Sequence, residues 1–240
     1  MTTYTARSLS TWEPHRTISS PTAHDTPRIT TLVRQGTGAN SLVAKFVQKN
    51  ARASAVWLPD PTWIDHADIG HDNAPGVRVR KYPYYNAVTR SFDFDAMMAR
   101  LECDAREDDV VLLHACAHNP TGLDPSESQR AGFADLCRRK KLFVVFDLAY
   151  QGFASGDLAK DAWAVRSFLD SSPLEFAVCR SFSKNLGLYG ERVTGHYTSS
   201  CPAPGPRTGP AVENAPGRQS TAPPSPSRHS LGAAWQSGAG

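Results

Sequence analysis

The chain has 240 residues, with 40% hydrophobic and 20% charged side chains, which are ordinary proportions for a globular protein. Its net charge is +3, and the segment from Tyr197 onward, with three arginines and one glutamate, carries most of that excess. The remaining body is almost neutral and has no apolar run of bilayer-spanning length, so we expect neither a nucleic-acid partner nor a membrane.

Composition divides the chain into three zones. Residues 1–30 are polar, contain three prolines and show no amphipathic period, so we expect them to be poorly structured. Residues 31–196 have the pattern of a folded domain. Residues 197–240 are mainly Pro, Gly, Ser and Ala, and they bury too little apolar surface to offset the entropy of ordering. We expect a disordered tail there.

Strand-like and helix-like patterns alternate within the middle zone. The predicted strands are Ser54–Leu58 (ended by Pro59), Val77–Tyr82, Asp109–Cys116, Leu142–Asp147 and Phe176–Cys179. The predicted helices are Asn40–Gln48, Phe92–Glu102, Pro125–Arg139 with Asp124 as N-cap, and Asp161–Asp170. This alternation predicts an α/β fold with a mostly parallel sheet flanked by helices on both faces. Ligands of such sheets bind beyond the carboxyl ends of the strands.

A lysine follows the last predicted strand, in the segment RSFSKNLGLYGER. Lys184 lies there between small residues and glycines, which places it to face a cleft. Lysine is the side chain that forms Schiff bases with carbonyl compounds. The alternative is an ordinary surface lysine, which is what most lysines are.

An acidic residue closes the apolar strand LFVVFD. Burying Asp147 in such a strand is costly unless it has a cationic partner, and the alternative is that it caps the next turn. Tyr150 lies three residues further on, where its hydroxyl can reach the same ligand.

Turn and phosphate-binding signals lie near the other strand ends. The sequence HNPTG follows a buried strand and places Asn119 at the sheet edge, although turn formation alone explains it as well. Arg192 is a candidate phosphate ligand. The run from Gln35 to Gly38 opens a helix whose N–H groups can bind phosphate, but it is not a Walker loop.

A metal site is a further alternative. His114, Cys116 and His118 alternate, and on a strand they would share one face. No fourth ligand is evident and Cys116 suits a core, so we expect no metal.

Taken in order, these motifs resemble one known family. HACAHNPTG, FDLAYQGFASG, DAWAVR and SFSKNLGLYGER, preceded by GTGAN and LPDPTWIDH, resemble the aspartate aminotransferase branch of the fold-type I pyridoxal-phosphate enzymes. The resemblance runs from about Thr31 to Val193 and implies a partial large domain of that fold. It implies pyridoxal 5'-phosphate as cofactor, amino-acid and 2-oxo-acid substrates, and a homodimer.

The resemblance assigns roles to the catalytic group. Lys184 matches the lysine that binds the cofactor covalently and moves a proton during the reaction. Asp147 matches the acid paired with the ring nitrogen. Tyr150 and Asn119 match the ligands of the phenolic oxygen, and Asn119 also matches a ligand of the substrate carboxylate.

It also assigns surrounding roles. Gly36, Thr37, Ser181 and Arg192 match phosphate ligands. Trp63 matches the indole that stacks on the ring, although a lone tryptophan is as readily explained by core packing. His66 matches a residue that lies behind the acid in the family, and His114 matches one nearby.

The chain departs from the family at both ends. About thirty unrelated residues precede the phosphate loop, Gln35 stands where the family usually has serine, and the match stops after Val193. The family's carboxylate-binding arginines lie beyond that point. We therefore expect a chain truncated at both ends and inactive by itself, with a frameshift or mis-spliced gene model behind the change of composition.

Alternatives remain for activity and location. The full reaction implied is amino transfer from aspartate to 2-oxoglutarate; the alternatives are an inactive cofactor-binding fragment, an aromatic-amino-acid aminotransferase or a carbon–sulfur lyase. Five cysteines without C-x-x-C spacing indicate a reducing compartment. We expect a cytoplasmic protein, with a mitochondrial one as the alternative.

Overall fold

The structure is a computed structural model that describes residues 28–171, 175–187, 189 and 194–200. Across these residues, seven strands form one main sheet in the order β1-β9-β8-β7-β6-β2-β3. The five strands that pair in parallel are β2 (Ala55–Asp60), β3 (Arg78–Pro83), β6 (Val110–His114), β7 (Phe143–Leu148) and β8 (Phe176–Arg180). The mostly parallel sheet predicted from the alternating pattern is confirmed.

Two strands at one side of the sheet run against this direction. β9 (Thr194–Ser200) pairs antiparallel with both β8 and β1 (Arg28–Arg34). The boundaries expected after residues 30 and 196 fall within these two strands. Residues 1–27 and 201–240, for which we expect disorder, lie outside the described residues. A separate small sheet joins β4 (Tyr85–Asn86) to β5 (Ser91–Phe92).

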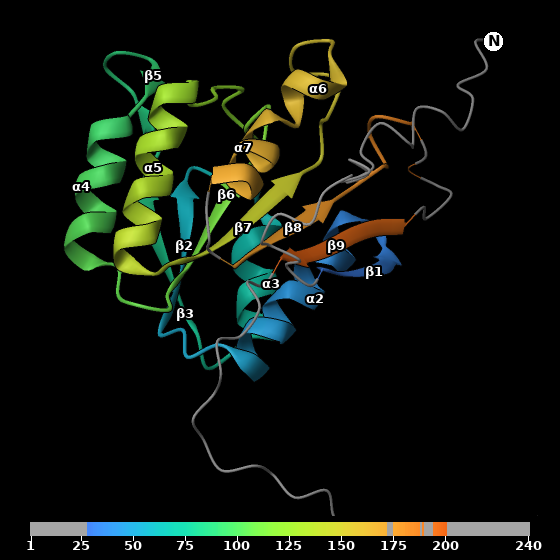
Figure 1. Cartoon of the computed structure of the whole chain (residues 1–240), viewed down its shortest axis with the longest axis horizontal. Coiled ribbons are helices and arrows are strands. Elements are labelled where there is room, and N and C mark those ends of the chain that lie inside the picture. Colours follow the sequence, from blue (N-terminus) through green and yellow to red (C-terminus); the bar gives the residue numbers. More distant parts are fainter. Residues whose placement is uncertain (1–27, 172–174, 188, 190–193, 201–240) are drawn as a thin grey trace, which may run out of the picture. The chain divides into compact units, whose positions relative to one another are not determined.

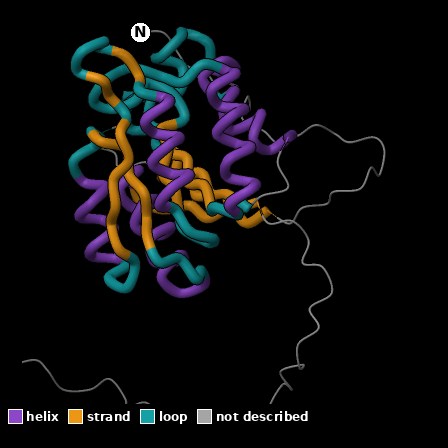
Figure 2. The backbone as a smooth tube through the Cα atoms, turned by 90° about the vertical axis from the view of Figure 1, so that its left-hand side faces the viewer, coloured by secondary structure: helices purple, strands orange, loops and turns teal. Residues whose placement is uncertain are grey.

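Helices cover both faces of the main sheet (Figures 1 and 2). α2 (Gln35–Asn50) and α3 (Asp65–Asn73) lie on one face, and α4 (Phe94–Asp104), α5 (Glu127–Lys140) and α7 (Trp163–Ser171) lie on the other. A short α6 (Leu158–Asp161) precedes α7. The helices predicted from periodicity are present, although the last of them is divided into α6 and α7.

Two apolar clusters hold these layers together. Ala39, Val43 and Val47 recur at helical spacing on α2 and are buried. They belong to a cluster that includes Val110 and Leu112 of β6, whereas Val111 and Leu113 of the same strand belong to the cluster beneath α4, α5 and α7. Because successive side chains of a strand point to opposite faces, a continuous apolar run such as β6 serves both layers.

Two local details differ from the predictions. The N-cap of α5 is Ser126, whose hydroxyl accepts the N–H of Gln129 in a capping box. Asp124 instead accepts the N–H groups of Ala117 and His118. β2 continues through Pro59 to Asp60, since its pairing with β6 is already complete at Trp57 and the missing N–H interrupts no bond on that side.

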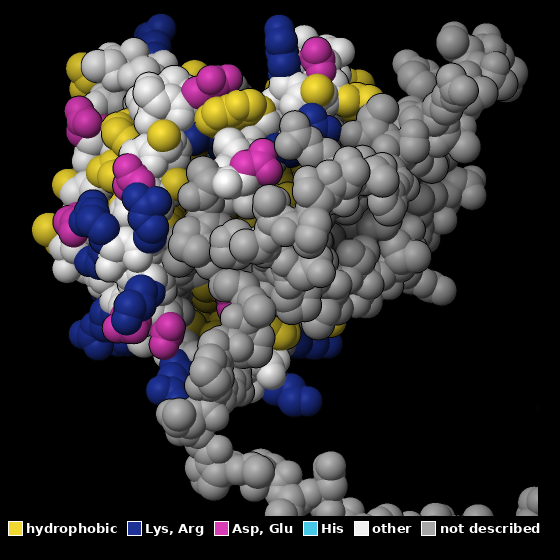
Figure 3. All heavy atoms as spheres, in the orientation of Figure 1, with side chains coloured by type: hydrophobic (Ala, Val, Ile, Leu, Met, Phe, Trp, Pro, Cys, Tyr) yellow, Lys and Arg dark blue, Asp and Glu magenta, His cyan; other side chains and the backbone are white. Residues whose placement is uncertain are grey.

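The surface over α4 and α5 carries side chains of both charges (Figure 3). Arg139 pairs with Glu102 at 3.0 Å and Lys141 with Glu107 at 2.7 Å. Among the described residues, no helix combines the length and apolar character needed to cross a bilayer.

Candidate functional site

A cavity of about 180 Å³ lies at the carboxyl ends of β2, β6, β7 and β8. Its lining includes nine of the residues predicted from sequence, namely Gly36, Thr37, Trp63, His114, Asn119, Asp147, Tyr150, Ser181 and Lys184. They come from positions up to 148 residues apart in the chain, and the parallel sheet brings them together because its strands all end at one edge. His66 lies behind this lining, in contact with Asp147.

Each strand positions a different part of the lining. Asp147 lies in β7 itself, and His114 is the last residue of β6. Asn119, Tyr150 and Lys184 lie in the loops that follow β6, β7 and β8. This arrangement leaves the charged and polar groups at the rim of a sheet whose interior is apolar.

Lys184 and Tyr150 contact each other in the lining of the cavity. The Nζ of Lys184 donates a 2.8 Å hydrogen bond to the Oη of Tyr150. Both residues are half-buried, so the amine is held in one place while staying within reach of a ligand. This contact, and the place of Lys184 in the cavity lining, favour a role in ligand binding over the alternative of an ordinary surface lysine.

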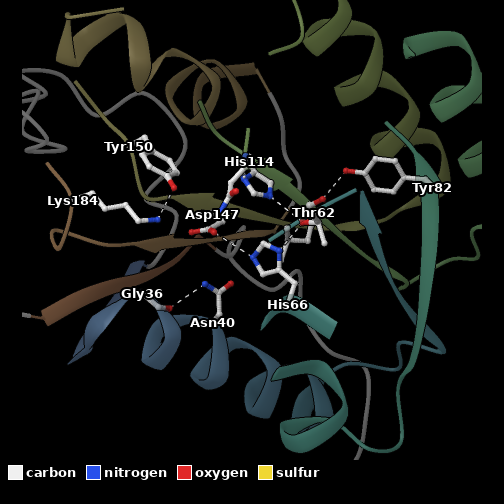
Figure 4. A network of polar contacts seen from close by, with 11 residues as sticks. Gly36, Asn40, Thr62, His66, Tyr82, His114, Asp147, Tyr150 and Lys184 are labelled. Atoms are coloured by element: carbon white, nitrogen blue, oxygen red, sulfur yellow. Dashed lines mark hydrogen bonds and ion pairs between the residues drawn. The ribbon is translucent and has the colours of Figure 1, made fainter. Parts of the chain in front are cut away.

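Asp147 lies beside His66, which begins a chain of polar contacts that continues to Thr62 and His114 (Figure 4). Its Oδ2 is 3.3 Å from the Nε2 of His66, within ion-pair distance but without the alignment of a hydrogen bond. The Nδ1 of His66 is 2.8 Å from the hydroxyl of Thr62, which is 3.1 Å from the Nε2 of His114. The carboxylate therefore contacts a histidine, and its alternative interpretation as a turn cap is not what the structure shows.

One backbone N–H group determines which groups donate and which accept along this chain of hydrogen bonds. The N–H of Asn119 donates to the Nδ1 of His114, so a neutral His114 carries its proton on Nε2 and donates it to Thr62. The hydroxyl of Thr62 is then free to donate to the Nδ1 of His66. A neutral His66 consequently presents its own N–H toward Asp147.

The electrostatics favour the ionised form of Asp147 and the neutral form of His114. Burial would raise the pKa of Asp147, but His66, His114 and Lys184 outweigh burial and hold that pKa below its ordinary value. Burial, together with His66 and Lys184 and against the opposing effect of Asp147, lowers the pKa of His114 to about 4. The site thus offers one buried anion toward the cavity.

The N-terminus of α2 forms the remaining wall. A Cβ added at Gly36 would lie 3.0 Å from the Cβ of Ser181, so the helix start and the end of β8 are in close contact. Gly36 and Thr37 of this first turn border the cavity together with Ser181. The remaining predicted phosphate ligand, Arg192, lies outside the described residues.

Several lining residues were not predicted. Asn40 is buried against the cavity and donates to the carbonyl of Gly36. Thr62 connects His66 to His114, 48 positions apart. Thr62 lies in the family-like segment LPDPTWIDH, which was the only signal for it in the sequence. Its contacts depend on how α3 docks against β6.

The alternating triad does not form a metal site. β6 ends at His114, so the strand alternation that would align His114, Cys116 and His118 is broken. The ring of His118 stacks on Tyr84 at 3.7 Å, and burial raises the pKa of the Cys116 thiol to about 12. Among the described residues, no group of three His, Cys, Asp or Glu side chains is arranged to hold a metal ion.

Comparison with known proteins agrees with this geometry. The family model described as aminotransferase class I and II matches residues 12–230, a longer stretch than the motifs cover. The L-tyrosine:2-oxoglutarate aminotransferase ucdG of Aspergillus ustus is 53% identical over 164 residues, which cover 68% of this chain and 31% of that protein. The cytoplasmic aspartate aminotransferase of Schizosaccharomyces pombe is 46% identical over 169 residues, covering 68% and 40%.

A solved structure shows the same fold. The aromatic-amino-acid aminotransferase of Burkholderia pseudomallei, covalently bound to pyridoxal phosphate, matches with a TM-score of 0.68 and 37% identity, covering 72% of this chain and 42% of that one. The chain spans 31% to 40% of the length of the two curated relatives. On the family match, the sheet order and the cavity, this chain belongs to the class I and II aminotransferases.

Proposed function

We propose that this chain binds pyridoxal 5'-phosphate in the cavity at the strand ends and acts in amino-group transfer between an amino acid and a 2-oxo acid. The observation that carries the proposal is the placement of Lys184 and the buried Asp147 in one cavity. An amine for a carbonyl carbon and a carboxylate for a protonated ring nitrogen are the two groups this cofactor requires.

The residues present fit the cofactor chemically. Asp147 is 7% exposed, so a cationic ring nitrogen would give it the partner that a buried carboxylate needs. The first turn of α2, with Ser181, supplies N–H and hydroxyl donors for a phosphate. Tyr150 and Asn119 would bond the phenolic oxygen, and Trp63 would lie against the ring.

The chain's own groups divide the work. Bound cofactor supplies an electron-withdrawing ring that stabilises negative charge at the substrate's α-carbon. Lys184, freed from that cofactor, would accept the α-proton, and Tyr150 would orient its amine through the 2.8 Å hydrogen bond. Asp147 would keep the ring nitrogen charged, and the His66–Thr62–His114 contacts would hold Asp147 in place.

The proposed reaction is transfer of the amino group of L-aspartate to 2-oxoglutarate, giving oxaloacetate and L-glutamate. The aspartate aminotransferase of Schizosaccharomyces pombe supports this choice. The second candidate is amino transfer from L-tyrosine, which the higher identity to the Aspergillus ustus enzyme favours.

Cofactor binding is tested by trapping. The chain is incubated with pyridoxal phosphate, reduced with borohydride and digested, and the labelled peptide is mapped by mass spectrometry. We expect the label on Lys184, no label there in Lys184→Ala, and wild-type labelling in Lys160→Ala, which removes an exposed lysine. Label on other lysines alone would contradict the proposal.

Substrate choice is tested separately, with 2-oxoglutarate as acceptor and aspartate or tyrosine as donor. Faster glutamate formation from aspartate supports the first candidate, and faster formation from tyrosine the second. Cofactor on Lys184 without turnover of either would support the remaining alternative, a cofactor-binding chain that is not an enzyme.

A homodimer and a cytoplasmic location complete the proposal. The dimer is expected from the family resemblance, and light scattering of the purified chain would test it. The name of the Schizosaccharomyces pombe relative supports the cytoplasm, and fractionation would distinguish it from the mitochondrial alternative.

A further inference from the structure

A buried carboxylate outside the cavity holds the loop that carries Tyr150. Asp161, the last residue of α6, is 4% exposed. Its Oδ2 accepts the N–H of Gly152 at 2.6 Å and of Ala154 at 3.1 Å. Its Oδ1 accepts the N–H and the hydroxyl of Ser155 at 3.1 and 2.7 Å. Four donors from three residues of one loop therefore converge on this side chain.

The same loop is fixed at two further points. Gln151 is buried and donates to the carbonyl of Leu158 at 2.9 Å. Gly152 has a φ of 92°, and a Cβ there would lie 2.9 Å from Leu158. The backbone directly after Tyr150 is thus confined to one path, and the strand β7 ends at Leu148, two residues before Tyr150.

Tyr150 is the residue at which this path meets the cavity. Its Oη accepts the hydrogen bond from Lys184, and its carbonyl accepts the N–H of Phe153 within the same loop (Figure 4). Asp161 is not among the residues that line the cavity, so any effect on the site passes through the loop.

We propose that Asp161 is a positioning residue, which through its four hydrogen bonds places the Tyr150 hydroxyl against Lys184. The inference rests on the proposed function, in which these two side chains bind the cofactor. A carboxylate is required because all four partners are donors, and an amide in its place turns one NH₂ group toward N–H groups.

The chain contains a matched control. Asp109 is 1% exposed and also accepts several hydrogen bonds, from Ser54, Ala55, Trp57 and Arg106. It precedes β6, at the edge of the sheet opposite the cavity. Asp109→Asn therefore imposes a similar loss of hydrogen bonding without touching the Tyr150 loop.

The test measures how readily Lys184 reacts in the full 240-residue chain without added cofactor. Acetylation of Lys184 is followed by peptide mass spectrometry, with the exposed Lys49 as internal reference. We expect Asp161→Asn and Tyr150→Phe each to raise the relative rate about fivefold, the factor that loss of one hydrogen bond typically gives. The double variant should show no further rise, and Asp109→Asn no rise.

Three results would overturn the inference. They are an unchanged rate in folded Asp161→Asn, an equal rise in Asp109→Asn, and a multiplied rise in the double variant. If Asp161→Asn does not fold, Ser155→Ala removes the hydroxyl bond to Asp161, along with the hydroxyl's contacts to the Asp157 backbone, and keeps the three backbone bonds to Asp161. A smaller rise that disappears in a Tyr150→Phe background supports the inference, and no rise refutes it.

Cofactor trapping on the wild-type chain separates this inference from the proposed function. If the cofactor does not attach to Lys184 but the acetylation pattern holds, the proposed function fails and Asp161 still positions Tyr150. If the cofactor attaches but the pattern is absent, only the role of Asp161 fails.

Discussion

Among single residues, Asp147 combines burial with a charge that faces the cavity. Its carboxylate is 7% exposed and is kept ionised by His66, His114 and Lys184. We predict that Asp147→Asn, which keeps the shape but removes the charge, weakens cofactor binding by about 2–5 kcal/mol, the range for breaking a buried charge pair. Titration followed by the absorbance of bound cofactor would measure this.

The control for that titration is Asp60→Asn. Asp60 is also a carboxylate at a strand end, but it is exposed and pairs with Lys81 at 3.2 Å. Exposed ion pairs of this kind contribute little to stability. The affinity of Asp60→Asn for the cofactor should therefore equal that of the wild type. An equal loss in both variants would show that the effect of Asp147→Asn is not specific to the site.

Thr62 offers a second test at this scale, because its hydroxyl connects two buried imidazoles. We predict that Thr62→Val leaves the facing nitrogens of His66 and His114 without a partner and lowers the free energy of unfolding by about 1–3 kcal/mol. Thr62→Ser keeps the hydroxyl and should lose less. Urea denaturation measures both, and equal losses would contradict a role for the hydroxyl.

Among the elements, the turn from His114 to Asp124 carries two histidines whose protonation opposes folding. Burial lowers the pKa of His114 to about 4 and that of His118 to about 3. Since unfolded histidine titrates near 6.5, the unfolded chain binds more protons as pH falls below that value. Stability is therefore full above about pH 6.5 and is lost on acidification toward pH 4.

We predict a loss of up to about 1.4 kcal/mol per pH unit for each of these two histidines between pH 6 and 4.5. Urea midpoints at several pH values would show the slope. In His118→Gln the dependence of the unfolding free energy on pH should lose the contribution of one of the two histidines. His71→Gln, on an exposed part of α3, should leave this dependence unchanged. A stability independent of pH in this window would contradict the burial of both rings.

For the molecule as a whole, the approach of α2 to β8 is the contact that closes the cavity. A Cβ at Gly36 would meet Ser181 at 3.0 Å, so we predict that Gly36→Ala costs about 1–3 kcal/mol of stability and weakens cofactor binding. Gly132, inside α5, has its nearest contact at 3.4 Å from Phe94. Gly132→Ala should therefore stabilise the chain by about 0.5–1 kcal/mol.

Both variants are measured by urea denaturation and by cofactor titration. Comparing Gly36→Ala with Gly132→Ala separates the effect of adding a methyl group to a helix from the effect of adding it beside Ser181. If Gly132→Ala also destabilised the chain, an added methyl group would be unfavourable at both positions. The loss of stability in Gly36→Ala could then not be attributed to the close contact between α2 and β8.

The sequence alone determined most strands and helices and most residues that line the cavity. Runs such as Val110–Leu113 and Phe143–Phe146 are apolar throughout because both faces of the strand are covered, and that requirement appears in any single segment. Lys184, Asp147 and Asn119 were identifiable because they follow or close such runs, where parallel strands end at one edge.

Only the tertiary structure decided which distant residues meet. The polar segment Thr194–Ser200 has no alternating apolar pattern, and its place between β1 and β8 follows from pairing along the sheet edge. The contacts of Thr62 with His114 and of Asp161 with the Tyr150 loop depend on how helices dock on the sheet. A hydrogen bond forms between atoms a few ångströms apart, and residue spacing along the chain does not record that distance.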